Sequence, residues 1–140
     1  MGCKYKGYCS DMTRTIFVDF VQDSIKEIYD LVLKNQLTVL DEIQDGANTK
    51  TIAKIVEGNF RVNDYELMHA LGHGVGLEVH EGPILSVRCE RNLKEGMVIT
   101  NEPGIYIPGK FGVRIEDTVL VESAGNEVLT KSNKDYCIVG

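Results

Sequence analysis

Apolar and polar residues follow two different periods along this chain. Between residues 23 and 45, apolar side chains recur every three or four positions, which is typical of one face of an amphipathic helix. Asp23-Ser24 can cap the start of this helix, and Asp45-Gly46 marks its end. The same spacing predicts a shorter helix from Asn48-Thr49 to Gly58-Asn59. The apolar positions that predict the two helices are Ile25, Ile28, Tyr29, Val32, Leu33, Leu37, Leu40 and Ile43, followed by Ile52, Ala53, Ile55 and Val56.

The rest of the chain shows a period of two, which is typical of strands. Residues 3–18 are rich in Tyr, Thr, Ile and Val, with Gly7 near their middle, and this favours two strands or one bent strand. Alternation also predicts strands over residues 75–79, 97–100, 105–107 and 112–121, and a hairpin turn at Gly125-Asn126. Strands, two helices and strands again, in this order, indicate an α+β fold. Both helices are expected on one face of a curved, mostly antiparallel sheet.

Composition narrows the class of protein. By length, the 140 residues form one domain or a piece of one. A net charge of −6 without a basic run argues against nucleic acid or an anionic membrane as a partner. The sequence shows no apolar run of membrane-spanning length and no signal-peptide pattern. Four scattered cysteines without a C-x-x-C pair favour reduced thiols, and so a cytoplasmic protein.

A glycine-rich run around two histidines is the strongest candidate for chemistry. His73 lies between Gly72 and Gly74, and His80 follows seven positions later. Glycines allow close backbone approach and can clear space around an imidazole ring. A single histidine in a soluble domain is most often a packed or surface residue. A metal site here therefore depends on carboxylates elsewhere in the chain.

Three carboxylates stand where strands end or break. Asp11 lies in a strand-rich segment that disfavours aspartate, so it is either a turn former or a carboxylate held for a purpose. Glu102 directly precedes a Pro-Gly break at a strand end. Glu116 shares one face of its strand with Arg114, opposite the apolar positions. A solvated salt-bridge face would give the same pattern as this last pair.

Together, Asp11, His73, Glu102 and Glu116 form a candidate metal constellation, with His80 as a neighbour. An imidazole with several carboxylates favours a hard or borderline divalent ion, such as Mn²⁺, Co²⁺, Zn²⁺ or Fe²⁺, over a thiolate site. Carboxylates can bridge two such ions, and a paired site can hold a hydroxide for hydrolysis. The residues therefore predict a divalent metal centre, although their spacing is less specific than a zinc-finger pattern.

Four segments of the chain resemble those of the Xaa-Pro aminopeptidase and Xaa-Pro dipeptidase (prolidase) family. They are residues 7–15, 72–83, 100–106 and 112–117, and they follow one another in the family's order over essentially the whole chain. The family consists of "pita-bread" dinuclear metallopeptidases and also includes the methionine aminopeptidases. The resemblance implies the C-terminal half of this α+β fold. Residues 1–140 would then be a single, partial catalytic domain.

The resemblance implies a metal role for each of the four candidate ligands. Asp11 and Glu116 resemble the two carboxylates that bridge both metals. His73 and Glu102 resemble ligands of one of them. In the family two metals are bound per site; manganese is expected first, and cobalt, zinc or iron would also suit these ligands.

Catalytic roles are implied for residues around the metals. His80 matches the histidine that contacts substrate and steadies the tetrahedral intermediate, and Glu102 matches the residue that shuttles the proton. Arg114 resembles an arginine that orients the carboxylates, and Thr13 would lie close to Asp11. Residues 77–79 and 105–109 resemble the proline-directed branch of the family more than the methionine-directed one.

The expected function is metal-dependent hydrolysis of Xaa-Pro bonds, at peptide N-termini or in dipeptides, by a metal-bridged hydroxide. Short proline-containing peptides are the expected substrates. Two alternatives stay open at this point. One is a methionine aminopeptidase, and the other is a non-catalytic relative that uses the fold for binding or assembly.

The sequence also departs from the family pattern. A further metal-binding aspartate of the family would fall immediately before Met1, and the first half of the catalytic fold, with another histidine, has no counterpart in these residues. We therefore expect one strong metal site, a weak second one, and weak or no activity in this chain alone. A half-fold exposes apolar surface, so association of two copies is a further expectation.

Overall fold

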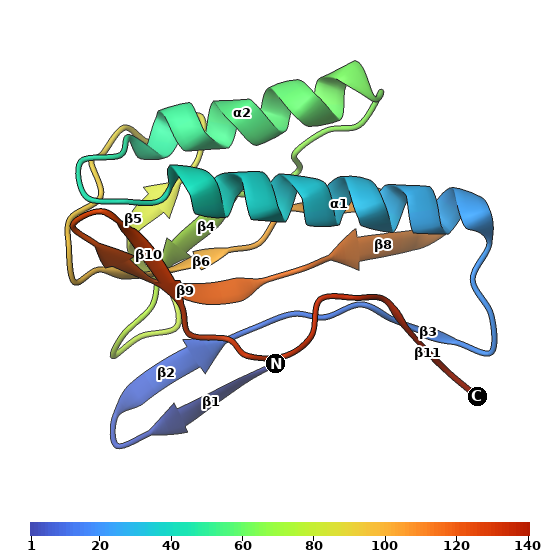
Figure 1. The fold of residues 1–140 in the computed structure, drawn as a ribbon, viewed down its shortest axis with the longest axis horizontal. Coiled ribbons are helices and arrows are strands. Elements are labelled where there is room, and N and C mark those ends of the chain that lie inside the picture. Colours follow the sequence, from blue (N-terminus) through green and yellow to red (C-terminus); the bar gives the residue numbers. More distant parts are fainter.

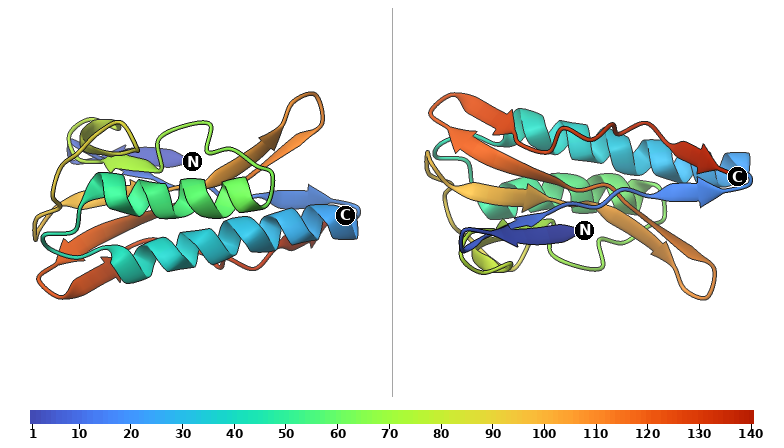
Figure 2. Two further views of the ribbon diagram at one scale, coloured as in Figure 1. Left: turned by 90° about the horizontal axis from the view of Figure 1, so that it is seen from above. Right: turned by 90° about the horizontal axis from the view of Figure 1, so that it is seen from below.

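Two helices lie side by side over one face of a β-sheet in the computed structural model, which describes all 140 residues (Figure 1; left view of Figure 2). The central sheet has five antiparallel strands in the order β10-β9-β6-β4-β5. The helices are α1 (Asp23–Glu42) and α2 (Thr49–Val62). The strands are β1 (Gly2–Tyr5), β2 (Tyr8–Asp11), β3 (Ile16–Val18), β4 (Gly72–Gly74), β5 (Glu81–Leu85), β6 (Val98–Asn101), β7 (Gly104–Ile107), β8 (Phe111–Arg114), β9 (Asp117–Glu122), β10 (Gly125–Val128) and β11 (Cys137–Val139).

The hydrophobic core lies between the helices and the sheet. Most of the predicted apolar positions of both helices are buried or partly buried, but Leu37, which was predicted on the apolar face of α1, is 44% exposed. Apolar residues of β6, β8 and β9 close the core from the other side. The fully buried members include Val32, Val39, Val56, Phe60, Ile99, Val113, Ile115 and Val119. The α+β fold with both helices on one face of a mostly antiparallel sheet is thereby confirmed.

Both helix starts lie close to the predicted positions, but two details of the prediction are wrong. Asn48 caps α2 as expected, because its side chain accepts hydrogen bonds from the amides of Lys50 and Thr51. α2 continues past Gly58 to Val62, because burial of Phe60 stabilises another helical turn. α1 begins at Asp23 after Gln22, whose side chain makes no capping bond.

Two predicted strands also differ from the structure. Residues 75–80 form a loop instead of a strand, in which Glu81 Oε1 accepts a hydrogen bond from the Glu78 amide at 2.8 Å. The strand predicted over residues 112–121 breaks between β8 and β9 at Ile115 and Glu116. Because of this break, the Glu116 amide donates a hydrogen bond to the Thr13 carbonyl, and β8 and β9 do not form one continuous strand. The predicted hairpin is present, with its turn just before Gly125.

The β1–β2 hairpin lies on the side of the sheet away from the helices (Figure 1). Thr118 on β9 donates to the Asp11 carbonyl at 2.6 Å, and the Cys9 amide donates to the Gly76 carbonyl at 2.7 Å. Near the C-terminus, β11 pairs in parallel with β3. These contacts hold the end of β2 beside β4 and β9. Neither helix is long and apolar enough to cross a membrane.

Candidate metal centre

Three of the four predicted ligands come together from distant parts of the chain. Asp11 ends β2, His73 is the central residue of β4, and Glu116 directly precedes β9. One ligand atom from each lies within 4.8 Å of the other two. His73 and Glu116 are buried, and Asp11 is partly exposed. The structure thus contains a compact group of one imidazole and two carboxylates that can hold a divalent cation.

Glu116 has one oxygen in use and one without a partner. Thr13 donates its hydroxyl hydrogen to Glu116 Oε2 at 2.5 Å. Glu116 is only 2% exposed, and its Oε1 atom is buried without any hydrogen-bond partner. Burial raises the pKa of Glu116 above its ordinary value, and the charges of Glu102 and Asp11 raise it further. The hydrogen bond from Thr13 acts in the opposite direction and lowers this pKa, but by less. An unpaired buried carboxylate oxygen is costly, and a bound cation would satisfy it.

His73 presents a defined nitrogen to the carboxylates. Its Nδ1 lies 3.0 Å from the Gly74 carbonyl, which can only accept, so Nδ1 carries the hydrogen. Nε2 then faces Glu102 Oε1 at 3.2 Å and Asp11 Oδ2 at 4.0 Å. Burial alone would lower the pKa of His73, but hydrogen bonds to Glu102 and Gly74, with the charges of Glu102 and Asp11, raise it above its ordinary value.

Glu102 lies at the edge of this group, just after β6. Thr100 donates its hydroxyl hydrogen to Glu102 Oε1 at 3.0 Å and accepts from the His73 amide at 3.0 Å, so it ties the two residues together. Burial would raise the pKa of Glu102, but the hydrogen bonds from His73 and Thr100 lower it below its ordinary value. Once His73 loses its Nε2 hydrogen, this nitrogen and the ionised Glu102 carboxylate, 3.2 Å apart, would both offer lone pairs to a cation. That donor set fits a cation between them.

The glycines beside His73 allow close backbone approach, which is one of the two roles predicted for them. A Cβ atom on Gly72 would lie 2.0 Å from the Thr100 carbonyl oxygen, and one on Gly74 would lie 2.3 Å from the Gly82 carbonyl oxygen. The two glycines therefore let β4 pack closely between β5 and β6 and do not clear space for a substrate.

His80 lies beside His73 although it belongs to the exposed loop. The two ring centroids are 4.4 Å apart and the rings are tilted by 58°. His80 is exposed, so its ring remains accessible to a molecule that approaches the metal centre. Its predicted contact with substrate stays a prediction.

Arg114 contacts the carboxylate region through Thr13. Its Nε donates to Thr13 Oγ1 at 3.1 Å, and this hydroxyl donates in turn to Glu116. On the other side, Arg114 Nη1 donates to the Tyr106 hydroxyl at 3.2 Å, and that hydroxyl lies 2.8 Å from His69 Nε2. Because arginine has only donors, Arg114 is the donor in both of its hydrogen bonds.

Sequence reasoning missed His69 and Tyr106. His69 stands in an irregular segment without periodicity, so no local pattern distinguishes it from a surface histidine. Tyr106 gave a weak signal, because alternation with the apolar Ile105 places it on the face of β7 away from the core. Only the tertiary structure shows that Tyr106 contacts Arg114 and that His69 contacts Tyr106.

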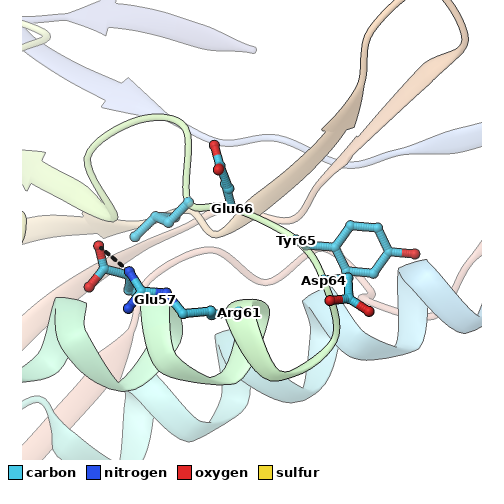
Figure 3. Close-up of a pocket in the computed structure, with 6 residues that line it drawn as sticks. Glu57, Arg61, Asp64, Tyr65 and Glu66 are labelled. Atoms are coloured by element: carbon cyan, nitrogen blue, oxygen red, sulfur yellow. Dashed lines mark ion pairs between the residues drawn. The ribbon is translucent and has the colours of Figure 1, made fainter.

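A separate pocket lies beyond the end of α2 and is lined mainly by charged side chains (Figure 3). Glu57 and Arg61 form an ion pair of 4.0 Å there. None of the predicted metal or catalytic residues lines this pocket, so it is distinct from the metal centre. Its lining residues are Glu57, Arg61, Asp64, Tyr65, Glu66 and Leu67.

Comparison with known proteins gives this arrangement a context. Residues 1–123 match the profile of metallopeptidase family M24. The chain is 46% identical over 138 residues to an Xaa-Pro dipeptidase of Pyrococcus furiosus, covering 96% of this chain and 39% of that protein. It is 44% identical to an uncharacterised peptidase of Bacillus subtilis, covering 99% and 40% of the two chains.

Solved structures agree with the sequence matches. An Xaa-Pro dipeptidase from Bacillus anthracis superposes with a TM-score of 0.91 at 47% identity, covering 96% of this chain and 39% of that one. An X-Pro aminopeptidase from Thermotoga maritima superposes with a TM-score of 0.94 at 39% identity, covering 99% and 40%. The chain thus spans about two fifths of the length of these relatives.

Proposed function

This chain belongs to metallopeptidase family M24, and on that premise we propose that it binds a divalent metal and contributes to hydrolysis of Xaa-Pro bonds. Residues 1–140 would act as one part of a catalytic domain. Short proline-containing peptides are the proposed substrates. The relatives named Xaa-Pro dipeptidase and X-Pro aminopeptidase support this choice.

One observation carries the metal proposal: the ligand atoms of Asp11, His73 and Glu116 converge, and Glu116 Oε1 is buried without a partner. Glu102, at 3.2 Å from His73 Nε2, would complete the ligand set. Four protein ligands of this kind suit Mn²⁺ first, with Co²⁺, Zn²⁺ or Fe²⁺ as alternatives. A second ion would share only Asp11 and Glu116 within these residues, so we propose one strong site and one weak site.

The protein's own residues would divide the work around the bound metal. When bound, the metal supplies Lewis acidity and activates water at neutral pH. Glu102, whose Oε1 lies 3.2 Å from His73 Nε2, would accept the proton released by the attacking water. His80, exposed beside His73, binds and orients the peptide. Arg114 holds Thr13, and Thr13 holds Glu116, so that the carboxylate keeps its direction.

Metal content and hydrolysis test the proposal together. We expect about one Mn²⁺ per chain by elemental analysis of the loaded protein, and loss of that metal in His73→Ala. His80→Ala is the matched control, because its ring lies next to His73 yet is not among the ligands. Metal retained in full by His73→Ala would overturn the site. Comparing the rates of Ala-Pro and Met-Ala hydrolysis tests whether the substrate class is that of an Xaa-Pro peptidase or of a methionine aminopeptidase.

Exposed apolar side chains support association of two copies of the chain. Ile16, Val18 and Phe20 are 60%, 68% and 72% exposed around β3, away from the helices. A monomer in light scattering at working concentration would contradict this part of the proposal.

The four free cysteines support a reducing compartment such as the cytoplasm.

A further inference from the structure

Behind the metal centre lies a buried ion-pair network whose central residue is Asp117. This residue is 0% exposed, follows Glu116 directly and begins β9. Arg14 Nη2 donates to its Oδ1 at 2.7 Å, and Lys134 Nζ donates to its Oδ2 at 2.8 Å. Gln36 Nε2 on α1 donates to the same Oδ2 at 2.7 Å. Both oxygens of a fully buried carboxylate are thus paired, with two cations.

Arg14 connects this network to the metal ligands. Its Nη1 donates to the carbonyl of Thr13 at 2.8 Å and to the carbonyl of Glu116 at 2.6 Å. The Glu116 amide donates in turn to the Thr13 carbonyl at 3.0 Å. Thr13 and Glu116 form an isolated β-bridge between the segment after β2 and the start of β9. Arg14 therefore donates to the carbonyl groups of both residues of this bridge. The spacing between Asp11 and Glu116 depends on this bridge.

Lys134 enters from a part of the chain that the family profile does not reach, because that match ends at residue 123. Arg14 Nε donates to the Asn133 carbonyl at 2.9 Å, and the Tyr29 hydroxyl donates to the Lys134 carbonyl at 3.0 Å. The segment before β11 is thus fixed against α1 and against the network. Lys134 Nζ also donates to Gln36 Oε1 at 3.2 Å.

We propose that Lys134 is a positioning residue for the metal centre, acting through Asp117 and Arg14 on the bridge between Thr13 and Glu116. Lys134 and Gln36 hold the Asp117 carboxylate from its Oδ2 side, and Arg14 holds it from the Oδ1 side. Without Lys134 the carboxylate would shift toward its remaining cation, and Arg14 would move with it. The carbonyls that Arg14 binds would then lose their alignment, and with them the two carboxylate ligands.

This inference rests on the metal site proposed above, and Mn²⁺ affinity measured by isothermal titration is its main test. Lys134→Met keeps the length of the side chain and removes its charge. We expect it to weaken Mn²⁺ binding about tenfold, in the range typical of residues that orient metal ligands. The absorption spectrum of the Co²⁺-loaded protein should change as well, because the ligand geometry changes. Lys134→Arg should restore most of the affinity.

Lys131→Met is the matched control, since Lys131 lies in the same segment, forms its ion pair with exposed Glu127 at 3.7 Å and donates to the Val128 carbonyl. It should bind Mn²⁺ as the wild type does. Wild-type affinity in Lys134→Met, even with a lowered melting temperature, would overturn the inference, and so would failure of Lys134→Arg to restore binding. A wild-type chain that binds no Mn²⁺ would overturn the proposed function itself, and this inference with it.

Gln36→Met provides an independent variant should Lys134→Met fail to fold. It removes one donor to Asp117 Oδ2 and one acceptor of Lys134 Nζ, and it leaves Arg14 and Lys134 themselves unchanged. The backbone carbonyl of Gln36, which accepts from Asn101, is unaffected. We expect weaker Mn²⁺ binding in the same direction but by a smaller factor. Unchanged affinity in this variant would also overturn the inference.

Discussion

The Tyr106 hydroxyl lies 2.8 Å from His69 Nε2, although the two residues are 37 positions apart. His69 Nδ1 lies 2.7 Å from the Ala70 carbonyl and must donate to it, so Nε2 accepts the hydrogen of Tyr106. The same hydroxyl accepts from Arg114. Tyr106 thereby joins the segment before β4 to the arginine that supports Thr13 and Glu116.

Tyr106→Phe removes both hydrogen bonds and leaves His69 Nε2 and Arg114 Nη1 without these partners. We expect the free energy of unfolding to fall by about 1–2 kcal/mol, the usual effect of partly buried hydrogen bonds lost on one side. Urea denaturation measures it. Tyr8→Phe is the control, because Tyr8 is 64% exposed and should change stability by less than about 0.5 kcal/mol. Equal effects of the two substitutions would contradict the role of Tyr106.

The Tyr106 ring also depends on a glycine. A Cβ atom on Gly104 would lie 2.6 Å from the Tyr106 hydroxyl oxygen. Gly104→Ala should therefore destabilise the fold by about 1–3 kcal/mol through overpacking. Gly58→Ala is the control in α2, where nothing lies within 4 Å of the added atom, and it should stabilise by about 0.5–1 kcal/mol. Thermal melting of both variants checks the difference in sign.

Periodicity predicted the helices and the core because both depend on burial that repeats along the chain. Val32, Val56 and Val119 lie where the spacing places them. The predicted strand over residues 75–79 was wrong because its alternation belongs to a loop, whose Gly76 carbonyl accepts a hydrogen bond from the Cys9 amide of the β1–β2 hairpin. Alternation alone does not reveal which backbone groups already have partners.

The sequence predicted the candidate metal ligands but not the ion-pair network behind them. Asp11, Glu102 and Glu116 stood out because carboxylates are depleted in strand-rich segments, and the family resemblance assigned them roles. The Asp117 network could not be predicted in the same way. Its members, Arg14, Gln36 and Lys134, come from three separate segments, and only the fold brings them to one carboxylate.

Thr13 links Arg114 to Glu116 through a single hydroxyl, which Thr13→Val removes with little change in shape. We expect Thr13→Val to weaken Mn²⁺ binding about tenfold, since residues that orient metal ligands typically contribute this much. Thr13→Ser keeps the hydroxyl and should retain most of the affinity. Isothermal titration of both variants is the measurement: equal Mn²⁺ affinities would show that the Thr13 hydroxyl does not position Glu116.

The pH dependence of stability follows from the pair of His73 and Glu102. The pKa of His73 is raised above 6.5 in the fold, so its stabilising contribution is complete below pH 6.5 and is lost as pH rises through the folded pKa. The pKa of Glu102 is lowered below 4.5, so its contribution is present above pH 4.5 and is lost as pH falls through the folded pKa. The pair therefore stabilises the metal-free chain most between these two values.

On the alkaline side of that window, metal reverses the trend. Metal-free protein should melt at progressively lower temperature as pH rises through the folded pKa of His73, because the bond from the imidazolium to Glu102 is lost. With Mn²⁺ in excess, the melting temperature should instead rise over the same range, since only neutral His73 can bind the metal. His73→Gln should show neither trend at this site. Parallel melting curves of the metal-free and Mn²⁺-loaded wild type across this range would show that His73 is not a ligand.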